Sequence, residues 1–130
     1  MRYFLFHCIS TILFFVPFVA MSAESGKKGD SPEAQVVFER KNDGVHYTIT
    51  INPPFKMNLK APFKFELRKS DTEILRKVPI TDFSKDPERE VYRLVSTAGE
   101  KQVRYWFIAC KYKGDEIVAC KTFSAQENIP

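Results

Sequence analysis

Histidine and cysteine, which often carry metal or nucleophilic chemistry, are scarce in this chain of 130 residues. It has two histidines and three cysteines, and only His46, Cys110 and Cys120 lie outside the apolar N-terminal segment. One histidine and two separated thiols do not make the four-ligand site of structural zinc. Nothing in the sequence marks His46 as the base that a nucleophilic cysteine needs, so we interpret it as a solvent-facing side chain.

Known catalytic signatures are also missing. The sequence has no phosphate-binding loop, no G-x-S-x-G, no H-E-x-x-H and no pair of carboxylates in a recognisable setting. It therefore predicts no cofactor, no metal site and no catalytic residue. A structural or binding role is favoured over an enzyme.

Long runs of like charge are absent as well. Lys and Arg number 20 and Asp and Glu number 16, and no block of five or six like charges occurs. A mild basic excess spread along the chain indicates a solvated surface rather than a nucleic-acid-binding protein.

The first 23 residues have the order of a secretory signal peptide. Arg2 precedes a strongly apolar run, which ends in the small residues Ala20, Ser22 and Ala23. An uncleaved membrane anchor is the alternative, because the run is about long enough to span a bilayer. Cleavage after Ser22 or Ala23 is favoured, since no basic cluster follows. We therefore expect a periplasmic or secreted protein that has no membrane contact once the leader and its Cys8 are removed.

Residues 24–34 are small, charged and turn-forming, and they predict a flexible linker. A single domain should then occupy residues 35–126, which is a normal size for one small core. Residues 45–51 (VHYTITI) alternate strictly between apolar and polar, as in a strand with one buried face. Asp43-Gly44 before them is a strong hairpin signal.

Further short alternating segments recur about every ten residues, and no segment shows a helical apolar stripe. Residues 63–67 form one such segment, residues 74–83 a short strand broken at Pro79, and residues 102–112 the longest. About seven strands at this spacing predict an all-β fold, an immunoglobulin-like antiparallel β-sandwich. A small β-barrel is the alternative.

Trp106 lies in the longest apolar segment, on the face opposite Tyr105 and Phe107 and in phase with Ile108 and Cys110. We expect it to be a core residue packed near the cysteine pair. A surface role in stacking on a ligand is the alternative.

Cys110 and Cys120 flank a polar turn, and in an exported protein two such cysteines are expected to pair. A three-residue loop, residues 114–116, would place Cys110 opposite Cys120 in an antiparallel hairpin, within disulfide reach. With a two-residue loop, Cys110 would face Ala119 and the bond would need a β-bulge. A disulfide between residues so close in sequence adds little to stability, which leaves a redox role open.

The sequence VRYWFIAC, a short loop and CKTFSA resembles the amino-terminal immunoglobulin-like domain of the thiol:disulfide interchange protein DsbD and related periplasmic domains. DGVHYTITINPPFKMNLKAPFKFEL adds to the resemblance. It implies an immunoglobulin-like fold and a dithiol/disulfide couple at Cys110 and Cys120, in which one sulfur accepts attack and the other resolves it. The nine residues between the cysteines exceed the short loop of that family.

Three functional interpretations follow. The first is a non-catalytic structural or binding module with a Cys110–Cys120 disulfide, and the second is a periplasmic thiol-disulfide exchange domain that uses the same pair. The third is pairing of a strand edge near residues 52–62 or 74–83 with another chain, although prolines protect both segments. The expected partner is an unidentified protein of the cell envelope.

Overall fold

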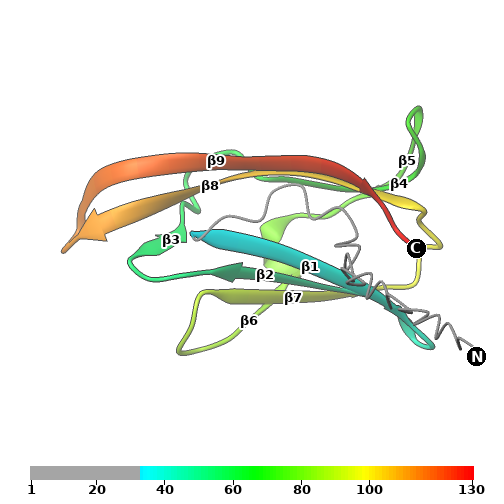
Figure 1. Ribbon diagram of the computed structural model, residues 1–130, viewed down its shortest axis with the longest axis horizontal. Coiled ribbons are helices and arrows are strands. Elements are labelled where there is room, and N and C mark those ends of the chain that lie inside the picture. The colour runs from blue at the N-terminus through cyan, green and yellow to red at the C-terminus, as the bar shows by residue number, and fades with distance from the viewer. Residues whose placement is uncertain (1–32) are drawn as a thin grey trace, which may run out of the picture.

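Alternation of apolar and polar residues produces two antiparallel β-sheets that face each other (Figure 1). The computed structural model describes residues 33–130. One short 3-10 turn, η1, accompanies the strands. The elements are β1 (Ala34–Lys41), β2 (Gly44–Ile51), β3 (Phe55–Met57), β4 (Lys64–Ser70), β5 (Glu73–Lys77), η1 (Ile80–Asp82), β6 (Ser84–Lys85), β7 (Val91–Ser96), β8 (Gln102–Lys113) and β9 (Glu116–Asn128).

The first sheet has four strands in the order β1-β2-β7-β6. The second has five strands built around β8. One edge of β8 pairs with β9 along its whole length, and the other edge pairs first with β4 and then with β3. β5 extends this sheet beyond β4. The all-β class and the sandwich arrangement are confirmed, and the alternative of a small barrel is wrong because the two sheets are separate.

The described residues form nine strands rather than about seven, since β3 and β6 have only three and two residues. Neither was predicted, because a pairing this short leaves no alternation in the sequence. The predicted break at Pro79 is confirmed, because β5 ends at Lys77 and η1 follows the proline. The predicted signal peptide and residues 24–32 of the predicted linker lie outside the described residues.

The core between the sheets is largely aromatic. Phe65 is at its centre, with ring centroids 5.2 Å from Tyr47, 5.1 Å from Phe83 and 6.2 Å from Tyr105. Burying each such side chain stabilises the fold by roughly 1.5–3 kcal/mol. Both sheets contribute to this cluster, which holds them together and leaves their other faces free to carry polar side chains.

Gly44 allows the first hairpin to pack closely against β7. Its φ is +132°, and a Cβ atom at this position would collide with the carbonyl oxygen of Ser96. Any other residue at position 44 would push β2 and β7 apart where they begin to pair.

A buried carboxylate closes one end of the sandwich. Glu100 is 0% exposed, and its Oε2 accepts a hydrogen bond of 2.6 Å from Ser96 Oγ. Arg40 Nη2 donates to the Glu100 backbone carbonyl at 3.0 Å. The buried Tyr47 hydroxyl makes no hydrogen bond with the described residues. This polar cluster had no counterpart among the sequence predictions.

No helix among the described residues has the length and apolar character needed to cross a membrane.

Candidate functional site

Cys110 of β8 and Cys120 of β9 form a disulfide at directly opposed positions of the hairpin. Their Cα atoms are 4.0 Å apart. The predicted pairing is therefore present, but the predicted loop length is wrong. The loop has two residues, Gly114 and Asp115, because Lys113 faces Glu116. Gly114 has φ +64°, as glycine does in the first central position of a type II′ turn.

A β-bulge restores the register between this short loop and the cysteines. Tyr112 faces Ile117, whereas Lys111 faces Ala119, so Val118 is an additional residue on β9. Without the bulge a two-residue loop would place Cys110 opposite Ala119. Because Val118 is left out of the ladder, Cys110 and Cys120 can face each other across a two-residue loop.

The two sulfur-bearing residues differ in exposure. Cys110 is 0% exposed and Cys120 is exposed. Asn58 covers the buried partner, with its Nδ2 3.6 Å from Cys110 Sγ. The Asn58 backbone amide is held by a 2.9 Å hydrogen bond to the Ile108 carbonyl. An incoming thiolate would therefore reach Cys120 more easily than Cys110.

The lysines near the disulfide do not share its face. Lys121 Nζ forms an ion pair with Glu33 Oε1, on the side of the hairpin that faces the other sheet. Lys111 is exposed and is in phase with Ala109, which is buried in the core. Both lysines therefore point away from the face that carries the two cysteines.

Beyond β3, the hairpin continues as a distal arm, residues 112–119, which extends past the rest of the sandwich (Figure 1). Ile117 and Val118 are 51% and 56% exposed there. The disulfide lies at the base of the distal arm and joins its two strands.

Trp106 lies on the outer face of the five-stranded sheet, so its predicted place in the core is wrong. Tyr105 and Phe107 point into the core and are almost fully buried, whereas Trp106 is partly exposed and lies opposite Lys64 of β4. Its phase with Ile108 and Cys110 was correct, but that phase belongs to the outer face. The alternative, a surface tryptophan able to stack on a ligand, therefore fits the structure better.

A half-open cleft of about 1260 Å³ lies over this face, between the β4–β5 hairpin and β9. We call it the outer-face cleft. Its outward-pointing lining side chains are Lys64, Glu66, Arg68, Ile74, Lys77, Arg104, Trp106, Ser124 and Gln126.

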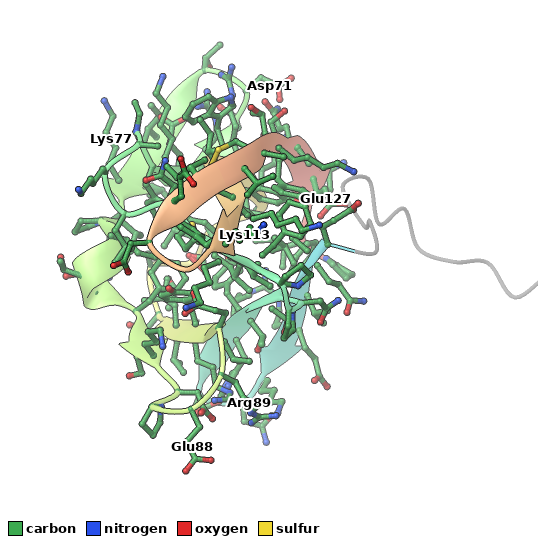
Figure 2. The ribbon with its side chains drawn as sticks, turned by 90° about the vertical axis from the view of Figure 1, so that its left-hand side faces the viewer. Asp71, Lys77, Glu88, Arg89, Lys113 and Glu127 are labelled. Atoms are coloured by element: carbon green, nitrogen blue, oxygen red, sulfur yellow. A yellow bond between two sulfur atoms is a disulfide. The ribbon has the colours of Figure 1, made fainter. Side chains whose placement is uncertain are left out.

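The tip of the β4–β5 hairpin bends over one end of the outer-face cleft. Asp71 in the turn accepts a 2.7 Å hydrogen bond from Gln126 Nε2, although β9 is two strands away from β4. Arg68, almost fully buried, donates to the carbonyl oxygens of Ser70 and Asp71 and fixes the turn. Figure 2 shows Asp71 and Lys77 on the side of the sheet away from β1 and β2.

Charge in the outer-face cleft is predominantly positive. Glu66 Oε1 is 3.1 Å from Arg68 Nη1, and their side chains are only 15% and 7% exposed, so these two charges compensate each other. Lys64, Lys77 and Arg104 form no ion pair within residues 33–130. Glu66 lies opposite both Lys77 and Arg104 in the sheet, and the cleft lining as a whole keeps an excess of positive charge. Of these cations, Lys64 and Arg104 flank Trp106.

His46 lies in the first hairpin, in the other sheet from the cysteines. Its Nε2 is 2.6 Å from Asp43 Oδ1, and this hydrogen bond lowers the pKa of Asp43. The pair is polar surface structure at the turn.

The alternating pattern predicted that most of the cleft residues lie on strands. No pattern in the sequence predicted that these strands would bring them together in one cleft. The cleft forms because a turn at residues 71–72 reaches a strand 55 positions further along the chain. Comparison of the chain with protein-family models, with curated proteins and with solved structures gives no match.

Proposed function

We propose that this protein is an exported, non-catalytic binding module with an immunoglobulin-like fold, and that the outer-face cleft is its ligand site. The observation that carries the proposal is a tryptophan flanked by two cations, Lys64 and Arg104, in a cleft that a bent hairpin bounds at one end. The exposed part of an aromatic side chain and cations without an ion pair stabilise little in the free protein, whereas a ligand would use both.

The strand order supports the immunoglobulin-like assignment. The orders β1-β2-β7-β6 and β5-β4-β8-β9 correspond to strands A-B-E-D and C′-C-F-G of immunoglobulin domains. In that comparison the cysteines join strands F and G within one sheet, rather than strands B and F across the two sheets. The disulfide would then act on the hairpin rather than on the core.

Export is supported by the predicted leader together with the disulfide, because such bonds persist mainly in oxidising compartments. We therefore place the protein in the periplasm or outside the cell, where its ligand or an envelope protein partner would be met.

Trp106 provides a direct test, because it is the only tryptophan in the chain. Arrays of extracellular glycans and peptides should be probed with the wild-type protein and with Trp106→Ala. We expect bound ligands to be lost or weakened at least tenfold in the variant, and to shift the fluorescence of the wild-type protein. Val95→Ala, an exposed site on the opposite sheet, serves as the control. Ligands that bind both variants equally would contradict the proposal.

Thiol-disulfide exchange is the second candidate, and the unequal exposure of the two cysteines favours it. A partner thiolate would attack Cys120 Sγ, the Cys110–Cys120 bond would break, and Cys110 would leave as a thiolate next to the Asn58 amide. A second partner thiolate would then attack the mixed disulfide, which would leave Cys120 reduced and the partner oxidised.

The reduction potential distinguishes the two candidates. A value below about −300 mV is expected for a structural bond, and a substantially higher value for exchange chemistry. Cys110→Ser retains the exposed Cys120, and it should trap a mixed disulfide only if exchange occurs. Cys120→Ser, which retains the shielded thiol, is the matched control.

A further inference from the structure

We propose that the outer-face cleft binds an anionic saccharide, a chain of sugar rings that carry carboxylate groups. This inference rests on the proposed binding function and adds the chemistry of the ligand. It is carried by the positions of the cations and hydrogen-bonding groups around Trp106.

The cations lie next to the aromatic ring. Lys64 is directly opposite Trp106 in the ladder between β4 and β8, where Cβ atoms are about 4.5–5.5 Å apart. Arg104 precedes Trp106 by two residues, on the same face of β8 and about 7 Å along the strand. A sugar ring stacked on the indole would thus have one cation beside it and another along the strand. Each cation could reach a carboxylate of the ligand.

Neutral hydrogen-bonding groups lie on the other side of the ring. Ser124 of β9 is directly opposite Trp106, and Gln126 is opposite Arg104. Hydroxyl and amide groups suit the hydroxyls of a sugar, and the apolar C–H face of a pyranose suits the face of the indole. Lys64, Trp106 and Ser124 therefore make one row that offers charge, stacking and hydrogen bonds.

The floor of the cleft excludes recognition by strand addition. β4 is paired with β5 and β8, and β8 with β4 and β9, so the main-chain groups there are used within the sheet. A ligand must be recognised by side chains. The volume of about 1260 Å³ exceeds that of usual small-molecule pockets, so the cleft fits more than one sugar ring.

A nucleic acid fits the cleft less well. Proteins that bind single strands stack successive bases on several aromatic side chains, and the outer-face cleft offers one indole.

The test uses the fluorescence of Trp106 in the full-length oxidised protein. We expect tetragalacturonate to bind at least about tenfold more tightly than the uncharged maltotetraose, because charge-assisted hydrogen bonds are the stronger ones. Lys64→Glu and Arg104→Glu should each weaken tetragalacturonate binding at least about tenfold, and added salt should weaken it further. Arg93→Glu, an exposed position in the other sheet, is the matched charge control and should change little.

A measurement on the unmodified protein covers the case in which a variant fails to fold. The ratio of quenching by iodide to quenching by caesium should be at least about twofold higher for Trp106 than for free N-acetyltryptophanamide, because the neighbouring cations concentrate anions. A ratio equal to that of the free compound would overturn the proposed electrostatic basis.

The outcomes separate this inference from the proposed function. A neutral sugar, a glutamate-rich peptide or single-stranded DNA that binds through Trp106 more tightly than tetragalacturonate would overturn the saccharide while retaining the cleft as a binding site. Binding of tetragalacturonate that Lys64→Glu and Arg104→Glu leave unchanged would overturn the inference alone. If no probe in the arrays or in this series binds in a Trp106-dependent way, both proposals fail.

Discussion

The buried hydroxyl of Tyr47 makes the stability of the fold depend on pH. Its ring packs against Phe65, and its hydroxyl lies in the region of the buried Glu100. Burial, followed by the negative charge of Glu100, raises the pKa of Tyr47 far above its ordinary value of about 10. Burial also raises the pKa of Tyr92, whose hydroxyl donates a 2.8 Å hydrogen bond to Glu90.

Raised tyrosine pKa values predict a loss of stability at alkaline pH. Below pH 10 both hydroxyls are neutral in the folded and unfolded chain. Above pH 10 the unfolded chain ionises and the folded one does not, so each tyrosine lowers the free energy of unfolding by up to about 1.4 kcal/mol per pH unit. Tyr47→Phe should therefore reduce the difference in stability between pH 8 and pH 11, measured by urea unfolding.

The two tyrosines should differ at pH 8. Tyr47→Phe loses no hydrogen bond within the described residues, so its stability should stay within about 1 kcal/mol of the wild type or rise. Tyr92→Phe loses its bond to a carboxylate and should be about 1–3 kcal/mol less stable. Equal losses for both variants at pH 8 would show that the Tyr47 hydroxyl has a partner after all.

Single residues were the hardest features to predict. Both faces of β8 carry large apolar residues. The sequence therefore showed which residues share a face with Trp106, but not which of the two faces lies against the core. That side is set by Phe65 and Phe123 on neighbouring strands, which pack against Tyr105 and Phe107. Glu100 gave no signal, because a glutamate beside a glycine reads as an exposed turn.

Among the elements, the β8–β9 hairpin has its register set from two ends. Near the base, Phe107 and Phe123 face each other and stack with ring centroids 5.3 Å apart in the core. At the tip, the two-residue loop sets a register that differs by one residue. The bulge at Val118 absorbs this difference on the exposed distal arm, where an unpaired residue costs least.

Deletion of Val118 should therefore leave the Cys110–Cys120 bond intact. The register at the base would be unchanged, and the distal arm would become a regular ladder. We expect no reactive thiols when the purified variant is alkylated and its mass measured. Deletion of Ala125, also a single residue of β9 but packed against the core, should instead disrupt the fold. Free thiols in the Val118 deletion would contradict the proposed role of the bulge.

Removal of the disulfide should have only a moderate effect on stability. Closing a loop of this length contributes roughly 2–3 kcal/mol in the chain-entropy estimate, and the hairpin already restricts the same residues. The double variant Cys110→Ser with Cys120→Ser should therefore lose about 1–2 kcal/mol in urea unfolding. An unfolded double variant would show that the bond holds the sandwich itself together.

Elements were predicted better than their connections. Alternation located β2, β4 and β8, because one buried face leaves a period of two in the sequence. The loop of the last hairpin was predicted one residue too long, since Gly-Asp-Glu does not reveal where pairing resumes. The outer-face cleft depends on the Asp71–Gln126 contact between distant segments, which no local pattern encodes.

At the scale of the whole molecule, the predicted leader and the observed disulfide make a joint prediction. Produced in bacteria from the full sequence, the protein should be recovered from the envelope without its first 22 or 23 residues. Its intact mass should also show that both remaining cysteines resist alkylation until a reductant is added. A full-length product with freely alkylated Cys110 and Cys120 would contradict export and remove the support for an envelope ligand.

The position of the disulfide also determines what proteolysis can do to this molecule. Lys113 lies at the exposed end of the distal arm, inside the covalent ring closed by Cys110 and Cys120 (Figure 2). A trypsin-like cut after Lys113 would break the backbone, yet the two fragments would stay joined and both would keep their places in the five-stranded sheet. The nicked protein would separate only on reduction, so oxidising conditions would keep the fold together even after the chain is cut.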